Sequence, residues 1–418
     1  MKNTITPNQY KILSLSSLGG ILELYDFIIF VHFTKFISVL FFPPDMPDWL
    51  RIIQVYGLFS IGYFFRPVGG IIFAHYGDKL GRKKIFISSI VLMALPTLAI
   101  GLMPTYAEIG YYSVVILLLL RMMQGCAFGG ESSTSLVFAF EHVSKRHIGF
   151  ACALIVASFS GGGFLAVSVA KFINSHFTYD EIMLGAWRYP FILGGFFGVI
   201  TFILRSQTQE TPAFLSIKNK ISKNSLPIKD VFINYKSAAF IGVILYSLYF
   251  TATLVVNILA PSLLNKLFNI PLLTTSELTI VTYTFAIIGN LVFGVLADRF
   301  GMIKVLVLGV FFLSVSSIIF YYNLQHASEN IFLLAGINGF FFGSVGIIPA
   351  IVLNCFPSKL RLSGSAFTFG ISTAIFSGFG AIIVPSLSNF NVMAPAYYTS
   401  AFCIIVIFTA IYLLKKSK

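Results

Sequence analysis

Two carboxylates interrupt a long apolar run near the start of the chain. Glu23 and Asp26 stand three residues apart in the stretch LELYDF, so a helix would place them on one face. Two arginines, Arg66 and Arg121, lie inside later apolar runs. Ionisable residues inside a membrane are costly and face a cavity or a partner. We therefore expect both acids and both arginines to converge on one cavity near the middle of a bilayer.

Acids and arginines in one apolar pocket can link proton binding to solute binding. Pairing with an arginine favours the ionised carboxylate, whereas separation from it in a low-dielectric pocket favours the protonated acid. An anionic solute that competes for the arginine would therefore change the proton affinity of the acid. Arg66 and Arg121 would hold a solute carboxylate through charge-assisted, often bidentate bonds. The alternative is a set of static ion pairs that only join helices, although desolvation offsets much of the stability of such pairs.

The composition favours a membrane protein with many spans. The chain has 418 residues, of which 57% are hydrophobic and 10% charged, against about 25% charged in soluble domains. The net charge of +13 gathers at the ends of apolar segments without interleaved aromatic residues, which argues against nucleic-acid binding. The four cysteines show no metal-ligand spacing, so we expect neither a metal nor a cofactor.

Twelve apolar segments are long enough to cross a bilayer, which takes about 20 helical residues. The predicted fold is an all-α membrane protein with spans at Ile12 to Leu40, Ile52 to Tyr76, Ile85 to Met103, Tyr111 to Phe140, Ile148 to Phe172, Tyr189 to Leu204, Ala238 to Leu263, Leu278 to Leu296, Ile303 to Tyr322, Ile331 to Cys355, Gly364 to Leu387 and Ala394 to Leu414. An even number of spans places both chain ends on one side of the membrane.

The distribution of basic residues predicts which side that is. With the N-terminus in the cytoplasm, 21 of the 28 Lys and Arg residues fall in cytoplasmic segments and five on the opposite side. Because cytoplasmic loops carry an excess of Lys and Arg, both termini are predicted to be cytoplasmic. The predicted location is the bacterial inner membrane, where the basic face would contact anionic lipid.

An internal repeat divides the chain into two halves of six spans. AHYGDKLGRKK follows the second span and GVLADRFGMIK the eighth, while HVSKRHIG follows the fourth and FPSKLRLSG the tenth. The predicted organisation is a first half at 1–204, a cytoplasmic linker at 205–236 and a second half at 237–418. Paired six-span halves around a midplane site are typical of secondary transporters.

The segment GDKLGRKK resembles the signature loop of the major facilitator superfamily. Four further stretches narrow the resemblance: GGILELYDFIIF, FFRPVGG, RMMQGCAFGGESS and QETPAF. Together they are similar to the metabolite:proton symporter branch, which includes proline/betaine, α-ketoglutarate, citrate and shikimate transporters. The resemblance extends over the whole chain.

The resemblance implies roles for several charged residues. Related transporters couple protons through an acid in the first span and an arginine in the fourth, which here are Asp26 and Arg121, and we add Glu23 on the same helix face. The loop after the second span would form a cytoplasmic gate that stabilises an outward-open state, with Glu141 as the partner of Arg82. The expected gate residues are Asp78, Gly81, Arg82 and Glu141, with Asp298 and Arg299 at the matching place in the second half.

Neutral side chains complete the predicted solute site. No span of the second half carries a charged residue near its middle, so that half would recognise the shape of the solute. The candidates are Tyr25 in the first span and Asn257, Asn290 and Asn338 in the second half. Each asparagine has an alternative role, a hydrogen bond to a neighbouring helix.

The function predicted from these features is transport and not catalysis. We expect a secondary active transporter that imports a small organic carboxylate or zwitterionic osmolyte by proton symport with alternating access. A facilitator or exporter without proton coupling is the alternative on the same fold. A membrane enzyme would need a nucleophile, metal or phosphate-binding motif, and a sensor would need an appended domain. One chain suffices for a pathway, so we expect a monomer whose partners are solute, protons and lipid.

Overall fold

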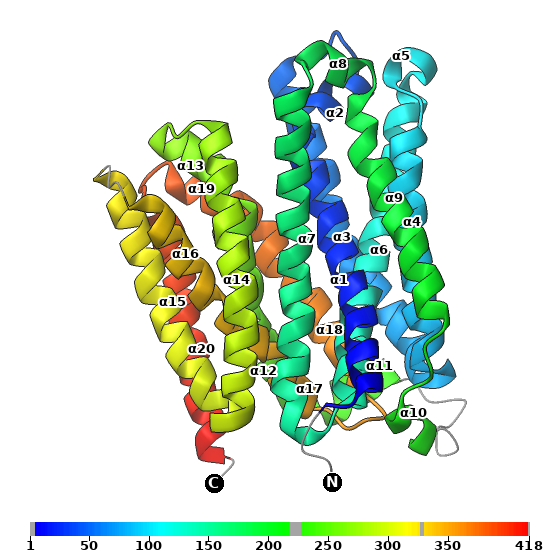
Figure 1. Ribbon diagram of the computed structural model, residues 1–418, viewed down its shortest axis with the longest axis vertical. Helices are drawn as coiled ribbons and strands as arrows, with labels where there is room; N and C mark the ends of the chain where they lie inside the picture. The colour runs from blue at the N-terminus through cyan, green and yellow to red at the C-terminus, as the bar shows by residue number, and fades with distance from the viewer. Residues whose placement is uncertain (1–4, 218–226, 327–329, 417–418) are drawn as a thin grey trace.

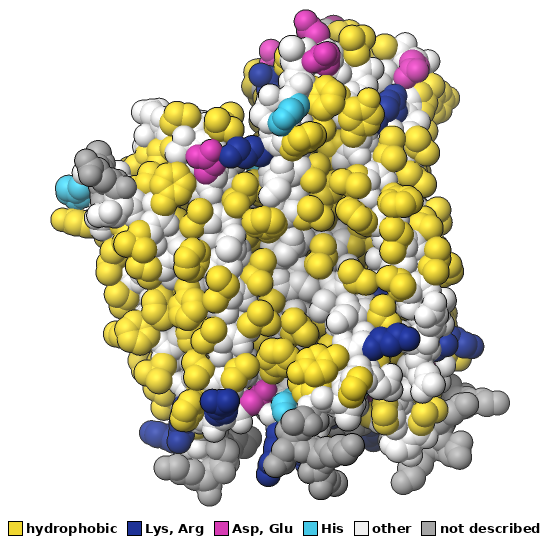
Figure 2. All heavy atoms as spheres, in the orientation of Figure 1, with side chains coloured by type: hydrophobic (Ala, Val, Ile, Leu, Met, Phe, Trp, Pro, Cys, Tyr) yellow, Lys and Arg dark blue, Asp and Glu magenta, His cyan; other side chains and the backbone are white. Residues whose placement is uncertain are grey.

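A computed structural model describes residues 5–217, 227–326 and 330–416 of the protein. None of these residues forms a β-strand, and twelve of their helices are long and apolar enough to cross a membrane. Figure 2 shows apolar side chains over the middle of the molecule and charged side chains mostly toward its two ends. The predicted all-α membrane architecture with twelve spans is confirmed.

The first half contains six spanning helices and several short helical turns between them. Its elements are α1 (Pro7–His32), α2 (Thr34–Phe41), α3 (Asp48–Leu80), α4 (Arg82–Leu102), α5 (Tyr106–Ile109), α6 (Tyr111–His142), η1 (Lys145–His147), α7 (Ile148–His176), α8 (Tyr179–Leu184), η2 (Ala186–Arg188) and α9 (Tyr189–Ser206). The expected first span is divided, because Phe33 leaves the helical conformation and turns the chain into α2. His32, Thr34 and Lys35 flank this turn, but apolar runs continue beyond them on both sides, so hydropathy taken over a whole span does not mark it.

The second half is built from more pieces. After α10 (Pro212–Ile217) and α11 (Pro227–Asn234) come α12 (Lys236–Ala252), η4 (Thr253–Ile258), α13 (Ala260–Phe268), α14 (Leu272–Phe300), α15 (Met302–Gln325), α16 (Ile331–Phe342), η5 (Gly343–Ile347), α17 (Ile348–Asn354), α18 (Arg361–Ser372), η6 (Thr373–Phe379), α19 (Gly380–Ser388) and α20 (Ala394–Lys416). The seventh, tenth and eleventh spans are therefore interrupted helices. Part of the predicted linker, 218–226, lies outside the described residues.

The two halves stand beside each other along their length (Figure 1). Helix α7 of the first half packs against α14 of the second, and α3 packs against α18. Helix α1 begins and α20 ends at the same end of the bundle, which we call the terminus end; the other is the opposite end. The side of the membrane on which the terminus end lies stays a prediction.

The sequence repeat corresponds to a repeated backbone geometry. Gly81 joins the second span to the third and Gly301 joins the eighth to the ninth, with φ angles of 113° and 96°. Side chains other than glycine avoid this left-handed region for steric reasons. A Cβ atom at Gly81 would also collide with the carboxylate of Glu210. Both tight turns therefore depend on glycine.

Candidate functional site

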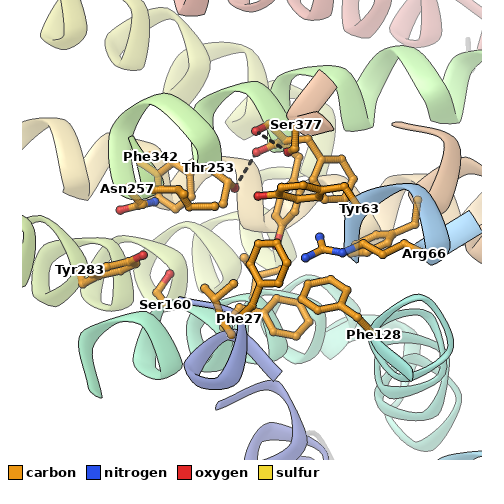
Figure 3. A pocket seen from close by; sticks show the side chains of 17 residues that line it. Phe27, Tyr63, Arg66, Phe128, Ser160, Thr253, Asn257, Tyr283, Phe342 and Ser377 are labelled. Carbon is orange, nitrogen blue, oxygen red and sulfur yellow. Dashed lines mark hydrogen bonds between the residues drawn. The ribbon is translucent and has the colours of Figure 1, made fainter. Parts of the chain in front are cut away.

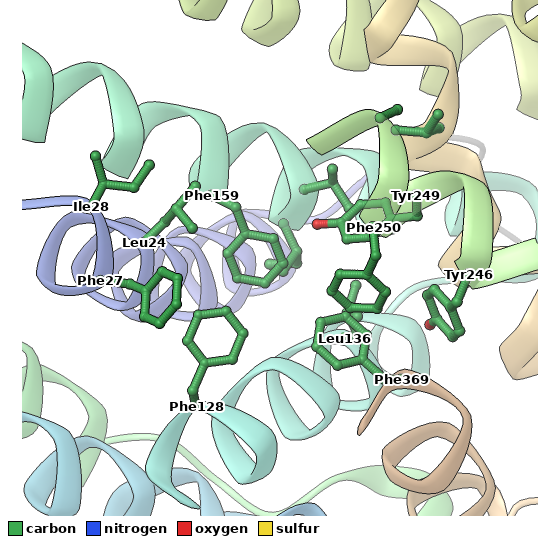
Figure 4. Packing of buried hydrophobic residues seen from close by; sticks show 14 of the residues in the cluster. Leu24, Phe27, Ile28, Phe128, Leu136, Phe159, Tyr246, Tyr249, Phe250 and Phe369 are labelled. Atoms are coloured by element: carbon green, nitrogen blue, oxygen red, sulfur yellow. The ribbon is translucent and has the colours of Figure 1, made fainter. Parts of the chain in front are cut away.

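A cavity lies between the two halves. Figure 4 shows apolar side chains that pack around it, among which the rings of Phe250 and Phe369 have centroids 4.8 Å apart. More than half of the described lining residues are aromatic: Phe27, Tyr63, Phe128, Phe159, Tyr249, Phe250, Tyr283, Phe342 and Phe369. Ring faces of this kind attract cations through their quadrupole.

Arg66 is the one charged residue among the described residues that line this cavity. Its guanidinium carbon lies 4.4 Å from the ring centroids of Phe27 and Tyr63 and 3.2 Å from that of Phe128 (Figure 3). Its Nη1 donates a hydrogen bond to Oγ1 of Thr373 in the other half, at 3.0 Å. Nε and Nη2 have no hydrogen-bond partner within the described part of the chain. Two free donors on a buried guanidinium match the oxygens of a carboxylate.

Asp26 and Arg121 do not form the predicted ion pair in this structure. No nitrogen of Arg121 lies within 4.0 Å of a carboxylate oxygen in the described ranges. Instead Gln124, three residues beyond Arg121 on α6, donates to Oδ2 of Asp26 at 2.5 Å and to Oγ1 of Thr97 at 3.0 Å. The Arg121 guanidinium carbon lies 3.5 Å from the centroid of the Phe30 ring. The neutral amide therefore occupies the place expected for the arginine.

The three residues predicted for proton coupling are not among the described residues that line the cavity. Leu24 and Phe27 of α1 line the cavity. Glu23 and Asp26 each come one residue earlier in the chain, so they lie on a neighbouring face of the same helix. Glu23 accepts a hydrogen bond from a serine of α6. Of the four charges predicted to meet at one cavity, Arg66 alone is among the described residues that line it.

A buried ion pair near the terminus end was missed in the sequence. Arg205 ends an apolar segment and was assigned to the linker, yet its side chain is fully buried and its Nη2 lies 2.7 Å from Oε1 of Glu131. Ser89 and Ser135 donate to the same carboxylate at 2.5 and 2.6 Å. Arg205 also donates to three backbone carbonyls. The feature of the sequence that could have indicated this ion pair is the position of Arg205 directly after an apolar run.

Of the four neutral candidates, the structure places Asn257 at the cavity. Tyr25 donates to a backbone carbonyl of α9 at 2.7 Å, which joins α1 to α9. Asn290 donates to a carbonyl one turn earlier on α14 at 2.7 Å. Asn338 accepts from two serines of α15 at 2.9 and 3.2 Å, beside a smaller cavity within the second half. The last three side chains therefore serve contacts within and between helices of one half.

Polar contacts between the halves close the terminus end. Oδ2 of Asp78 accepts from the backbone N–H and the hydroxyl of Ser363 at 3.0 and 2.7 Å. Nη2 of Arg82 lies 3.0 Å from Oδ1 of Asp78 and donates to the carbonyl of Ser358 at 2.7 Å. The expected contact of Arg82 with Glu141 is present, with 3.5 Å between Nε and Oε2.

The second half makes an equivalent contact with the first. Asp298 accepts from the backbone N–H groups of Gly149 and Phe150, at 2.7 and 2.9 Å, in the first turn of α7. Ser363 likewise belongs to the first turn of α18, so each half offers an acid to a helix N-terminus of the other, where the helix dipole favours an anion. Arg299 is exposed and forms no ion pair with another described residue, so its expected gate contact is absent.

Two residues that make contacts at the terminus end were not singled out in the sequence. Glu210, in QETPAF, accepts from the backbone N–H groups of Arg82 and Lys83 at 3.1 and 3.2 Å, where α4 begins. Nη1 of Arg361 lies 3.0 Å from Oε1 of Glu141 across the halves. Both residues belong to stretches noted for other reasons, and only the fold shows what they contact.

Comparisons with known proteins agree with this architecture. Residues 27–251 match the family described as Major Facilitator Superfamily. A putative proline/betaine transporter of Staphylococcus aureus (strain COL) is 31% identical over 406 residues, which cover 93% of this chain and 85% of that protein. The glycine betaine/proline/ectoine/pipecolic acid transporter OusA of Dickeya dadantii (strain 3937) is 28% identical over an alignment of 429 residues, which covers 96% of this chain and 83% of that protein.

A solved structure of the proton:xylose symporter XylE, bound to 6-bromo-6-deoxy-D-glucose, has the same fold. It superposes with a TM-score of 0.77 at 15% sequence identity and covers 97% of this chain and 95% of that one. The fold, the twelve spans and the relatives lead to one conclusion. The chain belongs to the Major Facilitator Superfamily and is a multi-pass integral membrane transporter, not an enzyme.

Proposed function

We propose that this transporter imports a small zwitterionic osmolyte of the proline/betaine class together with protons, by alternating access. The observation that carries the proposal is Arg66, whose Nε and Nη2 are buried at the cavity between the halves without a partner among the described residues. These two donors would bind the carboxylate of the solute. The names of the relatives support the same class of solute.

The charge of the cavity favours a zwitterion over a dicarboxylate or tricarboxylate. Arg66 is the one charged group among the described lining residues, so a second solute carboxylate would be buried without a cation, which is costly. A cationic group on the solute would instead meet the aromatic faces. Of the solutes carried by the resembling branch, proline and betaine have the matching charges.

Proton coupling is assigned to Asp26, with Arg121 and Glu23 as its neighbours in the first half. Oδ1 of Asp26 and two nitrogens of Arg121 have no partner within the described ranges, so these groups could meet in another conformation and separate again. In that arrangement the proton site lies beside the solute cavity and not in it, with α1 as the connection. Static packing of these charges, in a facilitator or exporter, is the alternative.

The closed terminus end corresponds to an outward-facing transporter if both termini are cytoplasmic in a bacterial inner membrane. The excess of basic residues on that side, 21 against five, supports this orientation. The halves at 1–204 and 237–418 would rotate about the solute, with the linker at 205–236 between them. Substrate, protons and lipid are the proposed partners of a monomer.

Arg66 is tested by binding and uptake in liposomes. We expect glycine betaine or proline to bind, and Arg66→Gln to weaken binding by about 30-fold or more, since loss of one partner of a buried charge pair costs about 2–5 kcal/mol. Arg299→Gln removes an exposed arginine and serves as the matched control. Equal binding by both variants would contradict the assignment of Arg66.

Asp26 is tested with a pH dye trapped in the same liposomes. Solute added outside should acidify the lumen in the unmodified protein. Asp26→Asn should abolish the acidification while labelled solute still enters. Acidification that survives this substitution would overturn the role of Asp26. Entry of labelled solute without acidification in the unmodified protein would instead favour the facilitator.

A further inference from the structure

The solute cavity has a second polar end. In Figure 3 Arg66 lies on one side of the cavity and Asn257 and Tyr283 lie on the other. Asn257 comes from η4 and Tyr283 from α14, and their side chains are 3% and 1% exposed. Neither Oδ1 of Asn257 nor the hydroxyl of Tyr283 has a hydrogen-bond partner among the described residues. Buried polar atoms without a partner are rare and call for an explanation.

The backbone around these two side chains is shaped to leave them at the cavity. In η4 the N–H of Leu259 bonds to the carbonyl of Leu254, five residues earlier, at 2.8 Å. Such widened turns occur frequently at functional sites. The hydroxyl of Tyr283 reaches Gly163 of α7, where a Cβ atom would collide with it. The wide turn and the glycine together admit both polar groups to the cavity.

Two other hydroxyls that the second half places at this cavity already donate a hydrogen bond. Thr253 donates to the carbonyl of Tyr249 at 2.7 Å, and Ser377 donates to the carbonyl of Phe250 at 3.4 Å (Figure 3). Each hydroxyl therefore uses its donor within the protein and keeps only oxygen lone pairs for a solute. Asn257 and Tyr283 are the residues of the second half whose polar atoms are fully buried at this cavity without a hydrogen bond to another described residue.

We infer that Asn257 and Tyr283 form a subsite that accepts a hydrogen bond from an N–H of the solute's ammonium group. The inference rests on the proposed function, in which Arg66 holds the carboxylate. An amide oxygen and a phenol oxygen are both acceptors, and no carboxylate among the described residues lines this cavity to compete for the cation. The preferred solute is therefore a zwitterion that retains an N–H, such as a secondary or tertiary ammonium. A quaternary ammonium has only methyl groups to offer and leaves both acceptors unpaired.

The experiment compares N,N-dimethylglycine with trimethylglycine, which carry the same charges and differ by one N–H. The dissociation constants of both ligands are measured on the purified full-length protein. The quantity compared between variants is the ratio of the dissociation constant of trimethylglycine to that of N,N-dimethylglycine. Tyr283→Phe keeps the ring that the additional methyl group would contact, so a change in the ratio for this variant reports on the N–H. The variants are Asn257→Leu and Tyr283→Phe, with Tyr321→Phe, beside the smaller cavity, as the matched control.

We expect Asn257→Leu to shift the ratio about tenfold toward trimethylglycine and Tyr283→Phe to shift it about threefold in the same direction. Tyr321→Phe should leave it unchanged. If Asn257→Leu does not fold, Tyr283→Phe decides, because it keeps the shape of the ring. An unchanged ratio with both ligands still bound would overturn the subsite alone. Failure of the unmodified protein to bind either ligand would overturn the proposed function and the subsite together.

Discussion

Replacing Asp78 with asparagine should move the protein out of the conformation described here. Oδ2 of Asp78 accepts two hydrogen bonds from Ser363 in the other half, at 3.0 and 2.7 Å, and these bonds help to hold the terminus end closed. The amide oxygen of asparagine can still accept them, but it carries no negative charge. The substitution therefore keeps the shape of the contact and weakens it.

The size of the effect follows from the two bonds that cross between the halves. A hydrogen bond to a charged group contributes about 1.5–3 kcal/mol and a neutral one about 0.5–1.5 kcal/mol, so the two bonds lose about 2 kcal/mol together. The ion pair of Asp78 with Arg82 lies within the first half and contributes to both conformations. A loss of about 2 kcal/mol changes the conformational equilibrium about 30-fold. A ratio of about 20:1 between molecules with the terminus end closed and molecules with it open would become about 2:3.

Distances between spin labels at the opposite end can measure this equilibrium. Leu184 on α8 and Leu272 on α14 belong to different halves and are 87% and 65% exposed, so labelled cysteines there, in a variant without the native cysteines, should be tolerated. When the terminus end opens, the opposite end should close and the short-distance population should grow. Asp180→Asn, which removes an exposed acid on α8, is the control. Equal distance distributions in Asp78→Asn and Asp180→Asn would refute the reasoning.

Three further outcomes are expected. Gly81→Ala should lower the stability by about 1–2 kcal/mol because of its positive φ, whereas Gly57→Ala, which meets no atom within 4 Å, should not; similar melting temperatures would contradict this. Glu131→Gln and Arg205→Met should each lower the free energy of unfolding by about 3–5 kcal/mol, because each leaves a buried group unpaired. The double variant should recover part of this loss. Strictly additive losses in thermal unfolding would disprove the coupling. Thr178, three residues earlier, donates its backbone N–H and its hydroxyl to Glu181 and so lowers the pKa of Glu181. The carboxylate therefore caps α8 fully above the ordinary glutamate pKa. The cap is lost as the pH falls through the lower pKa of the folded state. Hydrogen-exchange protection of α8 should fall over that acidic range and become independent of pH in Glu181→Gln; protection that does not vary with pH in the unmodified protein would contradict the cap.

Much of the fold could be predicted from the sequence because it depends on local properties of the chain. Apolar segments of about 20 residues have to be helical to satisfy their backbone in lipid, and this sets the number of spans. Gly81 and Gly301 stand at equivalent places in the repeat, and each turn needs a residue that tolerates a positive φ. The break at Phe33 was not predicted, because the polar residues beside it, His32, Thr34 and Lys35, stand between two apolar runs that together read as one span.

The partners of the charged residues could not be predicted in the same way. Asp26 was expected to meet Arg121, but Gln124 lies closer, because the rotation of α6 about its axis decides which side chain faces α1. Arg205 appeared to be a linker charge until α9 placed it against Glu131. Spacing along one helix says which residues share a face, but not which helix that face meets.

The sequence by itself therefore determined the membrane class, the twelve spans and the internal repeat that puts Gly81 and Gly301 at matching places. Only the tertiary structure decided that Arg66 lies at the cavity with free donors while Glu23 and Asp26 do not line it. The physical reason is that burial and hydropathy act on each segment separately, whereas a binding site depends on the packing angles between segments from both halves.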